Sequence, residues 1–168
     1  MYRIFPSPKQ CTFYHNTLSC TSYGSVTTAP EIEESCRAAG FDPAPLLASV
    51  FPGGFSPEGI TLTAEYVSCA PEGFQLNIAP SSIRISCGDG AGFFYALGVL
   101  VQLAAQAGGT LPCAEIADEP VLSVRGIMLD IGRDKIPAME TLRRLIDLFA
   151  SMRINHLQMY MEGFSFDY

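Results

Sequence analysis

The sequence predicts an α+β domain followed by the start of a second, parallel unit. Segments that alternate apolar and polar residues, together with one long apolar helix, predict a small sheet with two helices in residues 1–119. In residues 120–168 an apolar strand, an amphipathic helix and another strand predict a βαβ unit. The composition, 48% hydrophobic and 16% charged, supplies enough apolar material for a core and argues against disorder.

The first sixty residues predict one helix between irregular segments. Prolines at positions 6 and 8 exclude a helix from the first ten residues, which we expect to be extended. Pro30 opens a helix whose first turn is acidic, and Gly40 ends it. Residues 41–59 are rich in proline and glycine and predict a loop.

The next sixty residues predict four strands and the second helix. Residues 60–67, 74–78 and 83–87 alternate with period two, and the short turn at 79–82 predicts that the last two pair as a hairpin. Residues 90–106 predict a helix that is apolar nearly all round and therefore covered on most sides. A further strand is predicted around 113–116.

Asp118-Glu119-Pro120 marks the boundary of the second unit. The nearly continuous apolar run at 124–131 is typical of a strand buried on both faces of a parallel sheet. An amphipathic helix from Pro137 and a strand at 156–161 complete the βαβ unit. Because a lone βαβ unit leaves apolar faces uncovered, either the first domain supplies a sheet edge for it or the protein continues beyond residue 168, and the sequence favours continuation.

Composition and motifs exclude several classes of function. A net charge of −7 argues against a nucleic-acid partner. The absence of an apolar leader and of a run of ~20 apolar residues predicts a cytoplasmic protein with no membrane partner. The six cysteines are spread singly, so we expect reduced, mostly buried thiols and no metal site. Glycines at 88–92 are typical of a dinucleotide loop, but glycines stand where an acidic residue is needed ~20 positions later. Close helix packing explains them better, and no cofactor is predicted.

Several motifs in one order resemble family 20 β-N-acetylhexosaminidases. The run Val-Arg-Gly-Ile-Met-Leu-Asp-Ile-Gly-Arg at 124–133 resembles the family's opening barrel strand, with its Leu-Asp-x-x-Arg ending. Residues 140–160 are similar to the first helix and second strand of that barrel. Residues 90–103 and 111–120 resemble the helix and exit strand of the small domain that precedes it.

The resemblance implies a fold and an activity. It implies an ancillary α+β domain at 1–119 and, at 120–168, an incomplete start of a (β/α)8 TIM barrel. Family members release terminal β-linked N-acetylhexosamine with retention, using the substrate's acetamido oxygen as nucleophile. Their catalytic Asp-Glu pair lies on the fourth strand of a barrel of ~250 residues, so we expect this truncated chain to be inactive alone. The partner implied is an N-acetylhexosamine-containing glycan. The alternative is a non-catalytic carbohydrate-binding or protein-interaction module.

The resemblance assigns no catalytic residue to this chain and three substrate-binding candidates. Arg125 matches an arginine that grips hydroxyls of the terminal sugar, a task that suits the five fixed donors of a guanidinium. The alternative for Arg125 is an ion pair with Asp118 or Glu119 at the boundary between the units.

Glu162 and Asp130 are the other two candidates. Glu162 follows the second strand at the carboxyl end, where barrel enzymes build their sites, and its alternative is a solvated loop. Asp130 is a substrate contact, a cap or part of an internal ion pair. Tyr160 and Phe164 are candidates for stacking on a sugar, or for core packing. The family often has two aspartates near Glu162 and a histidine in place of Asp134, so both positions depart from its pattern.

Overall fold

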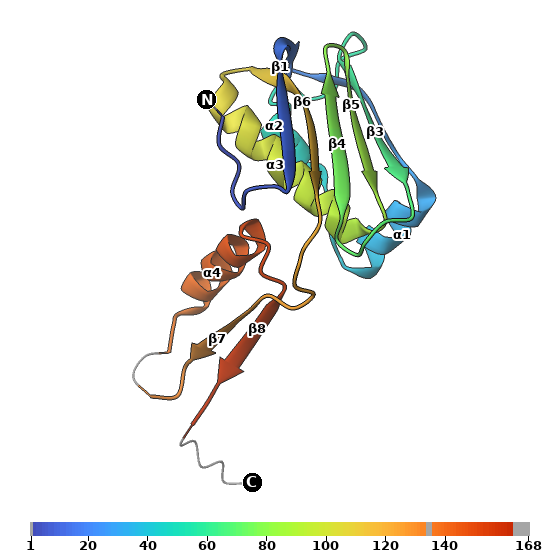
Figure 1. Cartoon of the computed structure of the whole chain (residues 1–168). Helices are drawn as coiled ribbons and strands as arrows, with labels where there is room; N and C mark the ends of the chain where they lie inside the picture. The colour runs from blue at the N-terminus through green and yellow to red at the C-terminus, as the bar shows by residue number, and fades with distance from the viewer. Residues whose placement is uncertain (1, 134–135, 163–168) are drawn as a thin grey trace. The chain divides into compact units, whose positions relative to one another are not determined.

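A computed structural model describes residues 2–133 and 136–162 (Figure 1). The chain divides into two compact units, Met1–Pro120 and Val121–Tyr168, which we call unit 1 and unit 2 and describe separately.

Unit 1 is a mixed six-stranded sheet with helices on one face (Figure 1). Its strands are in the order β1-β6-β4-β5-β3-β2; β3 is parallel to both β2 and β5, and the other pairs are antiparallel. Helix α3 packs on β4, β5 and β6, and helices α1 and α2 pack against α3. The elements are β1 (Gln10–Ser19), β2 (Tyr23–Thr28), α1 (Pro30–Ala38), α2 (Ala44–Val50), β3 (Ile60–Tyr66), β4 (Phe74–Ala79), β5 (Ser82–Cys87), α3 (Gly90–Ala107) and β6 (Thr110–Asp118).

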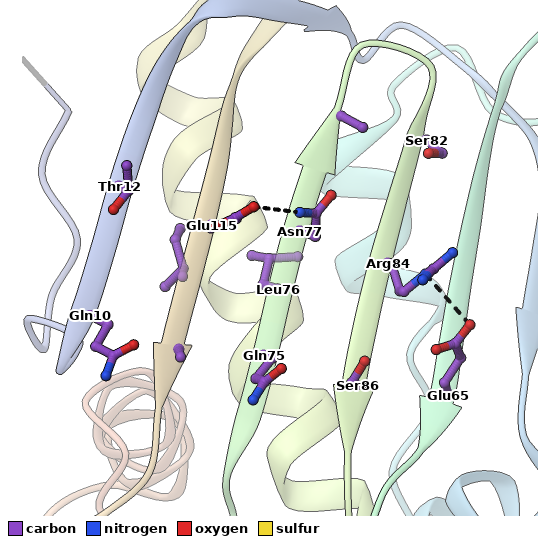
Figure 2. Close-up of a pocket in the computed structure, with 13 residues that line it drawn as sticks. Gln10, Thr12, Glu65, Gln75, Leu76, Asn77, Ser82, Arg84, Ser86 and Glu115 are labelled. Atoms are coloured by element: carbon purple, nitrogen blue, oxygen red, sulfur yellow. Dashed lines mark hydrogen bonds and ion pairs between the residues drawn. The ribbon is translucent and has the colours of Figure 1, made fainter.

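Strict alternation along the central strands separates a core face from an open face. Leu76 in β4 and Ile85 in β5 are buried beneath the helices. Gln75, Asn77 and Arg84 point to the other side, away from the helices of unit 1 (Figure 2). The predicted hairpin is confirmed, since β4 and β5 pair antiparallel. Burial of one apolar face therefore fixes the register of these strands.

Helix α3 is held close to the sheet at its beginning. The Asp89 carboxylate caps the helix by accepting hydrogen bonds from the backbone nitrogens of Gly92 (2.7 Å) and Glu72 (2.8 Å). A Cβ atom at Gly92 would fall inside contact distance of the Gly73 carbonyl oxygen, so only glycine fits there. Gly108 ends the helix with a left-handed φ of 60°. By length and composition α3 could cross a membrane, and half of it is buried inside the protein.

Two glutamines of α3 bind the leading segment of the chain. Gln102 and Gln106 lie one turn apart, and each side-chain amide pairs with the backbone of one residue of that segment. The Phe5 nitrogen donates to Oε1 of Gln102, and Nε2 of Gln102 donates to the Phe5 carbonyl, both at 2.7 Å. Gln106 pairs in the same way with Arg3, at 2.9 and 2.7 Å. These pairs explain why polar residues interrupt an apolar helix.

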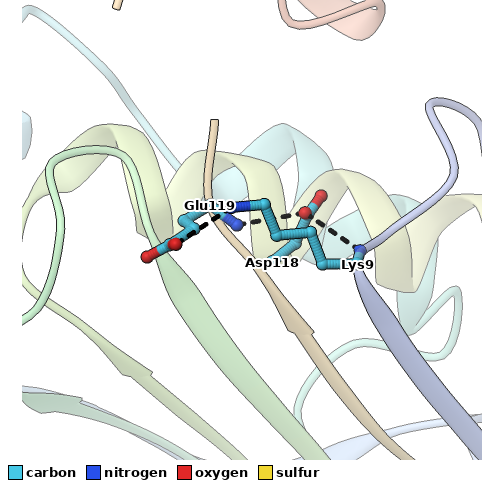
Figure 3. A network of polar contacts seen from close by, with 3 residues as sticks. All are labelled: Lys9, Asp118 and Glu119. Atoms are coloured by element: carbon cyan, nitrogen blue, oxygen red, sulfur yellow. Dashed lines mark hydrogen bonds and ion pairs between the residues drawn. The ribbon is translucent and has the colours of Figure 1, made fainter. Parts of the chain in front are cut away.

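A polar clamp joins the start of β1 to the end of β6 (Figure 3). The Lys9 backbone nitrogen donates to Oδ1 of Asp118 at 3.1 Å, and its ammonium group pairs with Glu119 at 2.9 Å. The same Asp118 oxygen accepts a hydrogen bond from the Glu119 nitrogen at 3.0 Å. The first and last strands of unit 1 are thus fastened at one end of the sheet.

The prediction of four strands and two helices for residues 1–119 was wrong, because β1, β2 and α2 were not expected. Both strands lie at sheet edges, and in β1 only Leu18 is buried, so neither shows an apolar alternation. Backbone pairing with a neighbouring strand holds each in place. In α2 the prolines cap the helix and occupy its first turn, positions where proline is compatible with a helix.

In residues 121–133 and 136–162, unit 2 has two parallel strands and one helix, β7 (Gly126–Asp130), α4 (Met139–Ser151) and β8 (His156–Tyr160). The predicted order strand–helix–strand is confirmed, although the first strand begins two residues after Val124 and the helix begins two residues after Pro137. No residue of α4 is buried. Large apolar side chains of unit 2 are exposed, among them Val121, Met128, Met139, Leu148 and Met161.

The cysteines are all free thiols. Cys20, Cys36, Cys87 and Cys113 are buried, as predicted, whereas Cys11 and Cys69 are exposed. Burial raises the pKa of the Cys87 thiol to about 12, with smaller contributions from Asp89 and other neighbours.

Candidate functional site

The carboxyl ends of β7 and β8 lie side by side in unit 2. The parallel register places Asp130 opposite Tyr160 at the last position of both strands. The Ile131 nitrogen continues the pairing by donating to the Tyr160 carbonyl at 2.9 Å. Side chains that follow the two strands therefore meet at one edge, which is where parallel α/β folds build their sites.

Arg133 connects the two carboxylates at this edge. Its Nε atom lies 3.2 Å from Oδ2 of Asp130 and 3.1 Å from Oε2 of Glu162, and its Nη2 atom lies 2.8 Å from the same Glu162 oxygen. The guanidinium carbon lies 5.6 Å from the centre of the Tyr160 ring. We call Asp130, Arg133, Tyr160 and Glu162 the carboxyl-end cluster.

A tight turn holds this cluster together. Oδ1 of Asp130 accepts a hydrogen bond from the Gly132 nitrogen at 3.0 Å, which fixes the carboxylate beside its own strand end. A Cβ atom at Gly132 would lie 2.5 Å from the Glu162 nitrogen. Glycine at this position therefore allows the segment after β7 to approach the segment after β8 closely.

Arg125 lies at the opposite end of β7. Its Nε atom donates to the Arg153 carbonyl and its Nη1 atom to the Leu122 carbonyl, both at 2.7 Å. Its backbone nitrogen donates to Oδ1 of Asn155 at 2.9 Å, and Asn155 in turn donates to the Ser123 carbonyl at 2.8 Å. In this unit Arg125 ties together the segments that precede the two strands.

The structure thus brings two of the three predicted site residues together and separates the third. Asp130 and Glu162 meet through Arg133, whereas Arg125 precedes the same strand at its amino end. Sequence reasoning missed Arg133, although it ends the Leu-Asp-x-x-Arg motif. Its position three residues after Asp130, just past a strand, is the signal that could have identified it. Asp134 and Phe164 lie outside the described residues.

The chemistry of the cluster suits a polar, uncharged ligand. Arg133 and Glu162 have side chains that are 66% and 56% exposed, so both can exchange their mutual contacts for a ligand. A guanidinium offers hydrogen-bond donors and a carboxylate offers acceptors, which together match vicinal hydroxyls. Within residues 2–133 and 136–162, no three histidine, cysteine or acidic side chains are grouped to hold a metal ion.

Comparison with known proteins places the chain in one family. The model of glycosyl hydrolase family 20, domain 2, matches residues 1–119. A β-hexosaminidase of Akkermansia muciniphila is 31% identical over 93 residues, which are 54% of this chain and 19% of that protein. A β-hexosaminidase of Vibrio vulnificus is 25% identical over 158 residues, which are 94% of this chain and 18% of that protein.

Solved structures share the fold. An exo-β-N-acetylglucosaminidase of Vibrio harveyi, in complex with N-acetylglucosamine, has a TM-score of 0.74 at 23% identity over 94% of this chain and 25% of its own. A β-N-acetylhexosaminidase of Bacteroides fragilis has a TM-score of 0.73 at 23% identity over 93% of this chain and 32% of its own. The chain spans about a fifth of the length of the two hexosaminidase relatives. Since the domain model covers well over half of its residues, this chain belongs to glycosyl hydrolase family 20.

Proposed function

We propose that the protein that contains this chain hydrolyses terminal β-linked N-acetylhexosamine. The match of residues 1–119 to domain 2 of glycosyl hydrolase family 20 carries this proposal. The hexosaminidase relatives suggest the substrate class, an N-acetylhexosamine-containing glycan. The mechanism is the substrate-assisted one, in which the substrate's acetamido oxygen attacks the anomeric carbon and configuration is retained.

Unit 2 is, in this proposal, the first strand–helix–strand of the catalytic barrel. Parallel pairing of β7 and β8 with a crossover helix is the repeating unit of such a barrel. The exposed apolar side chains of β7 and α4, such as Met128 and Leu148, are the surfaces that neighbouring barrel elements would cover. The Asp-Glu pair would come from the fourth strand, so the 168-residue chain alone would be inactive.

The carboxyl-end cluster would form one wall of the sugar site at the barrel mouth. Arg133 would donate hydrogen bonds to hydroxyls of the terminal sugar, and Glu162 would accept from them. Asp130 would hold the Arg133 guanidinium in position through their 3.2 Å contact. These roles bind and orient the sugar, while proton transfer belongs to the pair on the fourth strand.

Hydrolysis of p-nitrophenyl N-acetyl-β-glucosaminide and its galacto isomer tests the activity. A protein with this chain and a complete barrel should release p-nitrophenol, and the purified 168-residue chain should not. No turnover of either substrate by the barrel-containing protein would contradict the glycosidase assignment. Turnover by the chain alone would contradict only its proposed inactivity.

Two matched arginine variants separate the candidate sugar clamps in the barrel-containing protein. Arg133→Lys loses the planar fork and should lower kcat/KM by about 10- to 100-fold. Arg125→Lys should lower thermal stability while leaving kcat/KM within about threefold, because Arg125 bonds to backbone carbonyls. The reverse pattern would favour Arg125 as the clamp, as the family resemblance implies.

A further inference from the structure

The open face of the unit 1 sheet carries rows of polar side chains that span several strands. The register aligns Thr12, Glu115, Asn77 and Arg84 in one row across β1, β6, β4 and β5. A second row aligns polar residues of the same strands and of β3, namely Gln10, Gln75, Ser86 and Glu65, with Ala117 between the first two. Neighbouring strands lie ~4.8 Å apart, so each row is a regular ladder of donors and acceptors.

These rows line a shallow hollow of about 690 Å³, shown in Figure 2. That volume lies within the usual range of small-molecule sites, roughly 300–1,000 Å³. The only large apolar side chains in its lining, Leu76 and Ile116, are buried beneath the strands. The hollow therefore lacks the aromatic and aliphatic anchors that protein interfaces need.

Several polar groups of the hollow have no partner within the described part of the chain. The side chains of Gln10, Gln75 and Ser86 make no hydrogen bond there and point to solvent (Figure 2). Asn77 donates to Glu115 through a long contact of 3.4 Å. Amide and hydroxyl groups are thus free to bond to a ligand without breaking strong internal pairs.

The lining of the hollow carries two carboxylates, Glu65 and Glu115, and one guanidinium, Arg84. The Nε atom of Arg84 lies 3.5 Å from Oε1 of Glu65, so these two charges offset each other. Glu115 has Asn77 beside it and accepts a hydrogen bond from Tyr14, and this bond raises the pKa of the Tyr14 phenol. Two carboxylates and one guanidinium leave a single negative charge, which disfavours an anion, while the amides and hydroxyls of the hollow match a neutral ligand with many hydroxyl or amide groups.

Tyr14 adds an aromatic surface next to the hollow. Its side chain is 48% exposed and lines a second depression of about 410 Å³ that shares Asn77 and Ala79 with the first. Aromatic rings stack on the C–H face of a sugar, while neighbouring amides bond to its hydroxyls. The two depressions together can hold more than one sugar ring.

We propose that the open face of unit 1, centred on Gln75, Asn77 and Glu115 with Tyr14 at its edge, binds a neutral oligosaccharide. This site consists of residues of unit 1, whereas the carboxyl-end cluster consists of residues of unit 2, and it involves no bond cleavage. Its occupant is a chain of uncharged sugars, which the ladder of amides and hydroxyls would bind across the strands.

Frontal affinity chromatography of the 168-residue chain tests this assignment. Columns would carry triacetylchitotriose or maltotriose as neutral probes, and deacetylated chitotriose or a galacturonate trimer as charged ones. At least one neutral column should retain the chain longer than a blocked column does. Both charged columns should retain it about tenfold more weakly than that neutral column. No retention on either neutral column, or preference for a charged one, would overturn the proposal. Turnover plays no part, so this result is independent of the proposed hydrolysis.

Variants locate the site. The double variant Gln75→Ala/Asn77→Ala should weaken retention about tenfold or more, since each lost hydrogen bond is worth roughly three- to tenfold. Gln158→Ala, an exposed amide in strand β8 of unit 2, is the matched control and should change nothing. Gln75→Glu has nearly the same size as the wild type and covers the case in which the double variant misfolds. It should weaken retention several-fold, with an unchanged circular dichroism spectrum.

Two outcomes would reject this location. Equal losses in Gln158→Ala and in the open-face variants would place binding elsewhere. Conversion of a dimer to a monomer by the open-face variants in size-exclusion chromatography would make this face a protein interface instead.

Discussion

Units 1 and 2 follow the same rules of sequence patterning but differ in what covers their apolar surfaces. In unit 1 the apolar residues of α3 meet a sheet, and Leu97, Leu100 and Leu103 are completely buried. In unit 2 the amphipathic helix α4 buries no residue, and Ile146 and Leu148 remain about half exposed. An amphipathic pattern therefore indicates that a segment needs a partner, but it does not say whether the partner is present. Stability should thus be concentrated in unit 1.

Two leucine-to-alanine changes test this contrast most strongly. Leu97→Ala in α3 should lower the free energy of unfolding by about 3 kcal/mol, because it removes buried contacts and leaves a cavity. Leu148→Ala in α4, where the side chain is 51% exposed, should change it by less than about 0.5 kcal/mol. Urea unfolding followed by far-ultraviolet circular dichroism measures both. Equal effects would mean that α4 is packed in solution.

Two glycines of α3 provide a second test of tight packing in unit 1. Gly92→Ala should destabilise the fold by about 2 kcal/mol, since its Cβ would collide with the Gly73 carbonyl. Gly98→Ala meets nothing within 4 Å and should stabilise the helix by about 0.5–1 kcal/mol. Opposite shifts in the thermal midpoint are therefore expected. A neutral Gly92→Ala would contradict close contact between α3 and the loop before β4.

The caps of the two long helices also differ. Asp89→Ala should cost about 1 kcal/mol, whereas Asp89→Asn keeps an acceptor oxygen and should cost less. Helix α4 begins after Ala138 with no side-chain cap, so Ala138→Asp should raise helix content in unit 2 without moving the main unfolding transition. A shift of that transition by Ala138→Asp would mean that the two units unfold together.

The thiols of unit 1 provide a test that depends on pH. Only thiolates react with Ellman's reagent, so at pH 8 the exposed Cys11 and Cys69 should react before the four buried cysteines. Because the folded-state pKa of Cys87 is raised from 9.0 to about 12, its contribution to stability is present below pH 9. This contribution is lost as the pH rises from 9 towards 12, because in that range the Cys87 thiol loses its proton in the unfolded chain but keeps it in the folded one. The free energy of unfolding, measured at pH 8 and at pH 10.5, should therefore fall less between these pH values for Cys87→Ser than for the wild type.

Elements with a periodic apolar face could be predicted from the sequence, whether that face is covered, as in α3, or exposed, as in α4, and edge strands could not. The hairpin of β4 and β5 and the helix α3 were confirmed because burial on one side imposes a periodicity. Strands β1 and β2 depend on backbone pairing with a neighbour, which leaves no pattern in their own side chains.

The candidate site was predictable only in part, because strand ends can be located from the sequence but the approach of two loops cannot. Asp130 and Glu162 could be placed because both follow strands, and parallel strands end at a common edge. The partnership of Arg133 with both carboxylates depends on how two loops approach over Gly132, which spacing alone does not specify. Arg125 has the same chemistry as Arg133, so only the hydrogen bonds to backbone carbonyls distinguish it.

The clamp of Lys9, Asp118 and Glu119 has a consequence for the way unit 1 can be inherited. Because the chain enters β1 and leaves β6 at neighbouring positions, the sheet and its helices can be transferred as one insert between two adjacent residues of a host protein. Grafting residues 9–119 into a surface loop of an unrelated protein should therefore leave both partners folded, with unit 1 less stable because the contacts of Arg3, Ile4 and Phe5 are lost.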